Sequence, residues 1–314
     1  MYSLLGGIFL GWSLGANDAA NVFGTAVSSR MVKFWTAALL AAVFVVAGAL
    51  VEGQSGIKTL QGLTSFTSEQ AIIASVAAAA TVSLMTLLSL PVSASQAVVG
   101  AIMGIGLLNR QINFAGLGKV VVCWLGTPVG GIVLAIIIYK VLAAVANSMN
   151  LNIFQADMLL RVCLILAGSY GAYALGANNV ANVTAVFVGA GMLSISAAVL
   201  IGGLSIGLGI LTFSRGVMET VGKKLVRLDP FSALVVVLAQ AVTVHVYAFI
   251  GVPVSTSQAV IGAVLGVGMI KGVNTIRRRT LMHIFLAWFI TPFVTVLFAL
   301  SLDFASHLHY IPGH

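Results

Sequence analysis

The sequence has few charged residues and few cysteines. Only 7% of its 314 residues are charged, whereas a soluble domain carries about 25% because its surface must face water. Hydrophobic residues make up 60% of the chain, and the mean hydropathy is +1.12. The two cysteines, Cys123 and Cys163, are too few for a disulfide framework and form no metal-binding pattern. The shortage of charge excludes a soluble domain and predicts an integral membrane protein.

Long apolar runs take the place of charge. A helix of about 20 residues crosses a bilayer core of about 30 Å, and 34 glycines suit close helix packing in lipid. The first apolar stretch lacks a basic leader and contains Asn17 and Asp18, so no cleavable signal peptide is expected. An all-α membrane fold is therefore predicted. The uncharged runs are 34–51, 70–90, 120–139, 194–214, 231–270 and 281–302.

Three segments occur twice, in the same order, at offsets of 161, 162 and 164 positions. This spacing predicts two copies of one unit, residues 1–140 and 158–314, joined by a short cytoplasmic linker, 141–157. The pairs are Gly15-Ala-Asn-Asp-Ala-Ala-Asn-Val22 with Gly176-Ala-Asn-Asn-Val-Ala-Asn-Val183, Pro91-Val-Ser-Ala-Ser-Gln with Pro253-Val-Ser-Thr-Ser-Gln, and Thr127-Pro128 with Thr291-Pro292.

The basic residues indicate how the two copies lie in the membrane. If the N-terminus is outside and each Pro-Val-Ser segment is a hairpin that returns to its side of entry, twelve of the 15 basic residues lie inside. If each segment instead crosses once, the split is eight to seven. The positive-inside rule favours the hairpins. We therefore expect two inverted-topology repeats with broken helices, re-entrant helical hairpins and both termini outside, an arrangement typical of secondary transporters. The net charge of +8 reflects this topology rather than nucleic-acid binding.

The first repeated segment predicts a cation site. Asp18 lies in the middle of about 29 otherwise uncharged residues, and a carboxylate at membrane depth faces a partner or a wet cavity. Carboxylate and amide oxygens suit Na⁺, and an unwound helix would add backbone carbonyls. Hydrogen bonds between helices are the alternative role, but duplication of the cluster favours ion binding. The expected ligands are Asp18, Asn17, Asn21, Asn178, Asn179 and Asn182.

The second repeated segment predicts an anion site. Each Pro ends the helix before it, and the helices expected next, 96–108 and 258–270, are too short to span. The N-terminus of such a half-helix offers free amides and a partial positive charge, which bind phosphate and similar anions. Two of them, facing each other, would form a hydroxyl-rich pocket. The expected residues are Ser93, Ser95, Gln96, Ser255, Thr256, Ser257 and Gln258.

Two further residues have open roles. Glu52 lies at the end of a span, where it is either an ordinary solvated carboxylate or an entrance that attracts Na⁺. His245 precedes the second Pro-Val-Ser segment, and a hydrogen-bonded core histidine is the more common role there than a proton relay. Neither His245 nor His283 belongs to a catalytic motif, so we do not expect an enzyme. A passive anion channel would need basic groups in its pore, and no Lys or Arg lies inside a predicted span.

Gly15-Ala-Asn-Asp-Ala-Ala-Asn and Pro253-Val-Ser-Thr-Ser-Gln, each present twice, resemble motifs of the inorganic phosphate transporter (PiT) family over nearly the whole chain. The resemblance implies phosphate at the hairpins, Na⁺ or H⁺ at the Asn/Asp motifs, no cofactor and a homodimer. Three features depart from that family. Asn179 stands where members commonly have Asp, Ala94 stands where the second hairpin has Thr256, and a long hydrophilic central loop is missing.

The expected protein is therefore a multi-pass transporter of the cell membrane. It would carry inorganic phosphate through the lipid bilayer by symport with a cation, Na⁺ in the leading interpretation, through alternating access. An H⁺-coupled phosphate permease or a sulfate permease of the same fold is the alternative, because some members of the family carry sulfate.

Overall fold

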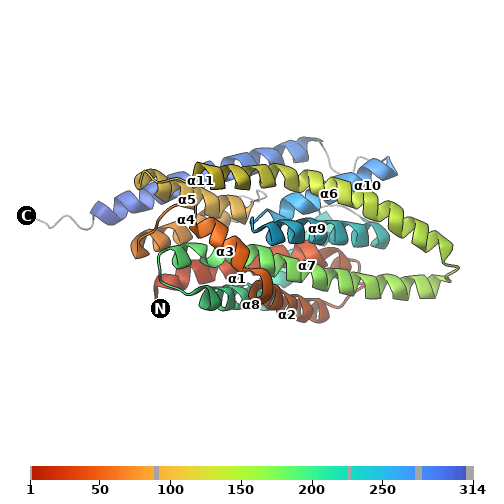
Figure 1. Cartoon of the computed structure of the whole chain (residues 1–314). Helices are drawn as coiled ribbons and strands as arrows, with labels where there is room; N and C mark the ends of the chain where they lie inside the picture. The colour runs from red at the N-terminus through yellow and green to blue at the C-terminus, as the bar shows by residue number, and fades with distance from the viewer. Residues whose placement is uncertain (1, 88–91, 225–227, 273–277, 309–314) are drawn as a thin grey trace, which may run out of the picture.

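The computed structural model describes residues 2–87, 92–224, 228–272 and 278–308, and within these ranges the chain is helical without a strand (Figure 1). A short 3-10 helix, Tyr2–Leu4, precedes the α-helices. These are α1 (Leu5–Ser28), α2 (Phe34–Glu52), α3 (Gln54–Gln61), α4 (Ser68–Leu87), α5 (Ala94–Leu108), α6 (Phe114–Ser148), α7 (Ile153–Gly189), α8 (Ile195–Lys224), α9 (Pro230–Ile250), α10 (Thr256–Lys271) and α11 (Arg278–Leu308).

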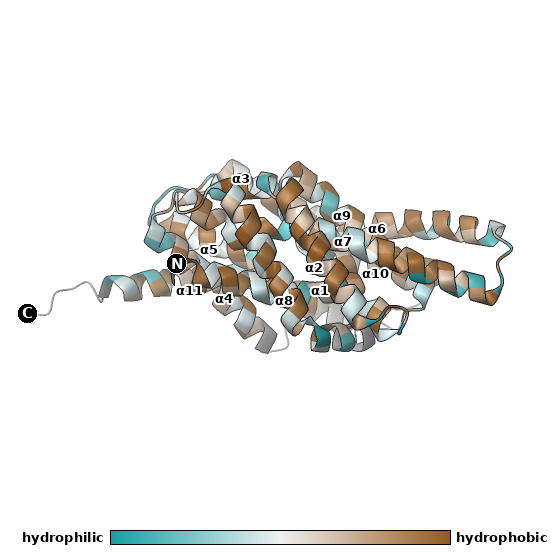
Figure 2. Cartoon of the chain, turned by 90° about the horizontal axis from the view of Figure 1, so that it is seen from below, coloured by the Kyte–Doolittle hydropathy of each residue, from teal (hydrophilic) through white to brown (hydrophobic). Residues whose placement is uncertain are grey.

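Seven of the described helices are long and apolar enough to cross a membrane. They carry the uncharged runs of the sequence, and hydrophobic residues cover their length while hydrophilic residues gather at the loops and helix ends (Figure 2). The predicted all-α integral membrane fold is confirmed. The seven segments are Phe34–Glu52, Ser68–Met85, Phe114–Ser148, Ile153–Gly189, Ile195–Glu219, Pro230–Ile250 and Ile284–His307.

The helices are interrupted at the two Pro-Val-Ser segments, as predicted. α4 ends at Leu87 and α5 begins at Ala94, while α9 ends at Ile250 and α10 begins at Thr256. With 15 and 16 residues, α5 and α10 are shorter than the roughly 20 residues that a full crossing needs. Gly251, with φ of 80°, ends α9 in the left-handed conformation that glycine adopts without strain. Pro91, in the first segment, lies outside the described residues.

The helices that carry the Asn motifs are continuous, so the unwinding predicted there is wrong. α1 and α7 pass through their motifs with regular helical bounds, because the amide side chains find partners on the same helix or on neighbouring segments without a break in the backbone. Much of the expected linker, 141–157, is also helical. α6 continues to Ser148 and α7 begins at Ile153, and the two helices extend together beyond the rest of the molecule at one end (Figure 1).

The pairs α4/α5 and α9/α10 occupy opposite ends of the molecule (Figure 1). Their interrupted ends meet in the middle, where the Ser95 hydroxyl donates to the Val254 carbonyl at 3.0 Å. α1, α2, α7 and α8 pack on one another beside these pairs, while α6 packs on α10 and α11 on α5. α1 begins and α11 ends at the same end of the molecule (Figure 1). The meeting point of the two pairs is therefore the centre of the fold.

A charged contact joins the ends of α9 and α10 that lie away from this meeting point. Asp229 caps α9 by accepting a hydrogen bond from the Ser232 amide at 3.0 Å, and Lys271 at the end of α10 donates to its carboxylate. Burial raises the pKa of Asp229, but the bonds from Lys271 and Ser232 outweigh it and lower that pKa to about 2. Asp229 therefore stays ionised near neutral pH.

Gly15 and Gly176, together with Gly209 and Gly48 on the helices that they face, allow the closest helix contacts. A Cβ atom at Gly15 would lie 1.9 Å from the carbonyl oxygen of Ile206, and one at Gly176 would lie 1.9 Å from that of Val45. Both oxygens belong to backbone that cannot rotate away. The contacts bring α1 against α8 and α7 against α2, and small residues that permit such approach are typical of helix interfaces in membranes.

We predict that Gly15→Ala destabilises the protein, because α1 and α8 must separate to admit the methyl group. The expected loss is about 1–3 kcal/mol, as for overpacking elsewhere, visible as a lower midpoint of thermal unfolding in detergent. Gly216→Ala on α8 is the matched control, since a Cβ atom there meets nothing within 4 Å. An unfolding midpoint for Gly15→Ala equal to that of the control would contradict the close approach.

Candidate functional site

The two short helices begin with serine caps at the centre of the fold. Ser93 accepts a hydrogen bond from the Gln96 amide, and Ser255 accepts one from the Gln258 amide, each at 3.3 Å. The predicted capping of both half-helices is confirmed. Because a cap satisfies only one of the free amides of a helix, the partial positive charge of α5 and of α10 remains directed at the meeting point.

Asn178 holds the second interrupted segment in place. Its side-chain amide donates to the Val254 carbonyl at 2.8 Å, and its side-chain oxygen accepts from the Val254 amide at 2.8 Å. The same carbonyl also accepts the Ser95 hydroxyl. A non-helical backbone needs such partners inside a membrane, where water does not supply them. α7 and the start of α5 therefore fix the extended backbone before α10.

Asp18 connects the two halves of the chain. Its Oδ2 accepts from the Asn179 amide at 2.7 Å, and its Oδ1 accepts from the Asn21 amide at 3.3 Å. Asn21 also donates to the Thr256 hydroxyl at 3.3 Å. Hydrogen bonds to a charged acceptor are stronger than neutral ones. The carboxylate of α1, an amide of α7 and a hydroxyl of α10 thus form one connected network.

One buried oxygen of this network, Asn182 Oδ1, has no hydrogen-bond partner among the described residues, and the same holds for Gln96 Oε1 and Gln258 Oε1 in the first turns of α5 and α10. The Asn182 side chain does donate, to the Ser95 hydroxyl at 2.9 Å and to Asn179 Oδ1 at 3.1 Å. Leaving a buried acceptor unpaired costs about 1–3 kcal/mol, so each such group needs an explanation such as a bound ion or ordered water. Neutral oxygens of this type are suitable ligands for a hard cation.

A small cavity lies where these groups meet. Its free space is about 10 Å³, which is close to the minimum that holds one water molecule. Asp18 contributes a carboxylate, while the starts of α5 and α10 contribute hydroxyls. A tetrahedral oxyanion would require the two helix pairs to separate slightly. The lining residues are Asp18, Val92, Ala94, Ser95, Asn179, Val254, Ser255, Thr256 and Ser257.

Six of the predicted site residues line the cavity: Asp18, Ser95, Asn179, Ser255, Thr256 and Ser257. Asn21, Asn178 and Asn182 do not line it but form hydrogen bonds to residues that do, and the others lie outside it. Asn17 donates to the Ser13 carbonyl of its own helix at 3.1 Å, while Gln96 and Gln258 are buried beside the caps. Glu52 lies in a separate cluster with His245. The role of the Val254 carbonyl could not be predicted from the sequence, since every residue has a main-chain carbonyl whatever its side chain. The proline before it was the only available signal.

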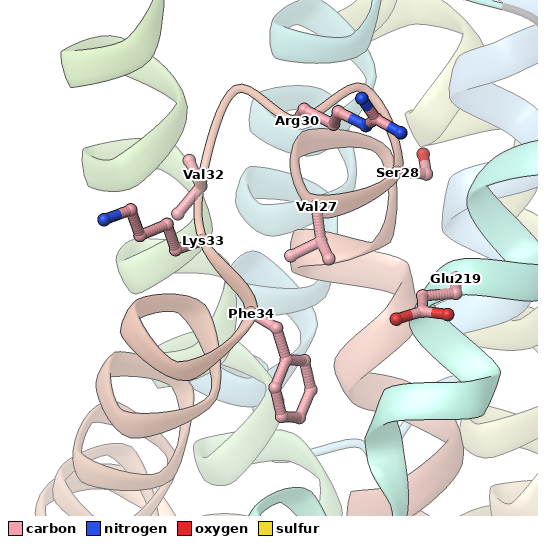
Figure 3. A pocket seen from close by; sticks show the side chains of 7 residues that line it. All are labelled: Val27, Ser28, Arg30, Val32, Lys33, Phe34 and Glu219. Carbon is pink, nitrogen blue, oxygen red and sulfur yellow. The ribbon is translucent and has the colours of Figure 1, made fainter.

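A second, larger cavity lies at the end of α1. It measures about 480 Å³ and contains Arg30 and Lys33 from the turn after α1 and Glu219 from α8. The Arg30 side chain extends toward Ser28, and the Lys33 side chain points in the opposite direction (Figure 3). Ten residues of α1 separate Ser28 from Asp18, which is about 15 Å along a helix. This cavity is therefore distinct from the central one. Its other lining residues are Val27, Val32 and Phe34.

Comparison with known proteins identifies the family. Residues 14–299 match the phosphate transporter family. The sulfate permease CysP of Bacillus subtilis is 30% identical over 300 residues, which cover 94% of this chain and 84% of that protein. The "Putative phosphate permease" of Methanocaldococcus jannaschii is 27% identical over 92% of each chain. A solved structure titled "The sodium-dependent phosphate transporter" superposes with a TM-score of 0.85 at 23% identity, covering 98% of this chain and all of that one.

The protein is thus a multi-pass membrane transporter and not an enzyme. More particularly, the chain belongs to the phosphate transporter family. The expected resemblance to phosphate transporters is confirmed.

We predict that Asn178→Ala lowers the unfolding midpoint in detergent, because it removes both bonds to Val254 and leaves a buried amide unpaired, a loss of about 1–3 kcal/mol. Asn150→Ala is the control, since Asn150 is exposed between α6 and α7. Equal midpoints for the two variants would show that Asn178 does not hold the segment.

Proposed function

We propose that this chain carries inorganic phosphate across the membrane by symport with a cation, Na⁺ in the first instance, through alternating access. The observation that carries the proposal is the meeting of two capped helix N-termini at a cavity that also contains the Asp18 carboxylate. Each N-terminus favours an anion. Hydroxyls of Ser95, Thr256 and Ser257 add donors that can follow the oxygens of a tetrahedral ion.

The position of Asp18 explains why a cation is needed. An anion in the cavity would lie close to a carboxylate, and two like charges repel strongly in a low-dielectric interior. A cation between them removes the repulsion, so each ion raises the affinity for the other, as thermodynamic linkage requires. The oxygens of Asp18, Asn21, Asn178, Asn179 and Asn182 are the ligands that we assign to the cation or cations. Asn17 is a weaker candidate because its amide bonds to its own helix.

The inverted repeat supplies the movement in this proposal. Contacts of the first half recur in the second: Gly100 approaches the Pro292 backbone and Gly262 the Pro128 backbone, as Gly15 and Gly176 do with their partners. Such duplication supports two equivalent units, residues 1–140 and 158–314, with α4/α5 and α9/α10 as hairpins that enter from opposite sides. Opening one hairpin at a time would expose the cavity to one side and then to the other.

Topology and assembly follow from the same argument. We infer that the N- and C-termini lie outside the cell membrane, because this orientation leaves twelve of the 15 basic residues inside. The wide cavity with Arg30 and Lys33 then lies at the inner surface. A homodimer in the lipid bilayer remains an expectation from the family resemblance.

Sulfate is the second candidate substrate, since the sulfate permease CysP is 30% identical. The two anions differ in one respect that matters at this site. Phosphate keeps a proton near neutral pH and can donate it to a carboxylate such as Asp18, whereas sulfate has only acceptors. The carboxylate in the cavity therefore favours phosphate.

We predict that Asp18→Asn lowers Na⁺-stimulated uptake of radiolabelled phosphate into proteoliposomes by about tenfold or more, the factor that corresponds to 1.4 kcal/mol. The substitution keeps the size of the side chain but removes its charge. Asp157→Asn is the control, because Asp157 forms an exposed pair with Arg161. Undiminished Na⁺ stimulation in Asp18→Asn would overturn the assignment of the cation site.

A competition experiment distinguishes the substrates. We expect wild-type phosphate uptake to persist in about tenfold excess of sulfate, because only phosphate can donate to the carboxylate. If sulfate abolishes the uptake, the site does not prefer phosphate as proposed, and if labelled sulfate enters while phosphate does not, the carried anion is sulfate. Uptake that follows a pH gradient and ignores Na⁺ would replace the coupling ion by H⁺.

A further inference from the structure

A second polar network lies outside the central cavity. His245 of α9 bonds through Nε2 to Glu52 Oε2 at 2.7 Å and through Nδ1 to the Tyr170 hydroxyl at 2.8 Å. The Tyr173 hydroxyl donates to Glu52 Oε1 at 2.8 Å. Both tyrosine rings stand edge-on to the imidazole, with centroids 5.4 and 5.6 Å away. The network joins α9 to α2 and α7, and neither the anion nor the cation site uses it.

The geometry allows His245 to gain or lose a proton without breaking a bond. An ionised Glu52 accepts only, so Nε2 must carry its hydrogen. Nδ1 then accepts from the Tyr170 hydroxyl when the imidazole is neutral, and donates to the same oxygen when the imidazole is protonated. Only the Tyr170 hydroxyl has to rotate. The side chains of His245 and Glu52 are 26% and 28% exposed, so neither is sealed inside the helix bundle.

The network also lies near the backbone that forms the central site. Tyr173 is five residues before Asn178 on α7, about 7.5 Å along the helix. α7 therefore contacts α9 and the segment that follows it at two points: Tyr170 contacts His245, and Asn178 binds Val254 just after α9. A change in the contact between Tyr170 and His245 therefore alters how firmly α9 is attached to α7.

We infer that His245, with Glu52 and the two tyrosines, is a proton-binding site that controls the attachment of α9 to α2 and α7. When His245 is neutral, its imidazole donates a hydrogen bond to the Glu52 carboxylate. When His245 is protonated, the same contact becomes an ion pair, which is stronger in a poorly solvated place. Acid pH therefore keeps α9 attached to α2 and α7 as in this structure, and a rise in pH weakens the attachment. This effect on transport rests on the proposed alternating access, whereas the proton site itself does not.

Other charged groups of the helices packed against α9 are engaged elsewhere or exposed. These are Lys119 of α6 on the Ile250 carbonyl, the exposed Lys140 of α6, Asp157 and Arg161 of α7 paired with each other, Lys271 of α10 on Asp229, Asp18 of α1 on Asn21 and Asn179, and the exposed Lys58 of α3. Among the described residues, Glu52, Tyr170 and Tyr173 are the titratable partners that the contacts give His245.

The first test compares thermal unfolding of wild type and His245→Gln in detergent at about pH 5.5 and pH 8, on either side of the ordinary histidine range. The contact with Glu52 is an ion pair only while the imidazole carries its second proton, so it stabilises the fold most at acid pH and less as the pH rises. The stability lost in His245→Gln should be larger at the lower pH. Glu52→Gln, which keeps the shape but removes the charge, should show the same pattern.

His307→Gln is the control, because His307 of α11 faces Asp303 at 3.6 Å but is 73% exposed, and an exposed pair contributes little to stability at either pH. Equal losses of stability at both pH values, in both the His245 and the Glu52 variants, would overturn the proton site. This measurement does not involve phosphate, so its outcome is independent of the substrate assignment.

The second test measures uptake into proteoliposomes. The ratio of His245→Gln uptake to wild-type uptake cancels the change of phosphate ionisation with pH. We expect this ratio to be about threefold higher at pH 5.5 than at pH 8, because only the wild type is held at acid pH. A ratio that is the same at both pH values, with Asp18-dependent uptake intact, would refute the control of α9 and leave the proposed function standing.

Discussion

A chain that interrupts its helices inside a bilayer must find partners for the backbone groups that are set free, because the surrounding lipid offers none. Here the partners come from the opposite half of the molecule or from neighbouring helices. The Val254 carbonyl accepts hydrogen bonds from Asn178 of α7 and from Ser95 of α5. The interrupted ends of α4/α5 and α9/α10 must therefore meet, and the arrangement of the other helices follows from that meeting.

The same constraint produces the functional site. The hydroxyls and amides at the interrupted segments are donors of the kind that an anion needs. The Asp18 carboxylate, which accepts hydrogen bonds from Asn21 and Asn179, is the kind of group that a cation needs. In the proposed function, the same side chains thus hold the fold together and bind the ions. The cavity has only about 10 Å³ of free space, because the polar groups around it form hydrogen bonds with one another.

Much of this site could be predicted from the sequence. Asp18, Ser95 and Thr256 were expected as ligands because a carboxylate and clustered hydroxyls are unusual at membrane depth, and the structure brings them to one cavity. The helix interruption at the second proline was also expected. The continuity of α1 and α7 was not, because a run of Asn and Gly is compatible with either a regular or an unwound helix, and only the neighbouring elements decide between them.

The sequence alone determined the membrane class, the duplication of the chain and the residue types at its centre, since these depend on composition and on spacing along the chain. The tertiary structure decided which atoms meet. The clamp of Asn178 on Val254, and the contact of Glu52 with His245 across 193 positions, depend on how α2, α7 and α9 pack. No local pattern encodes such contacts, because they form between residues whose distance in space is unrelated to their distance in sequence.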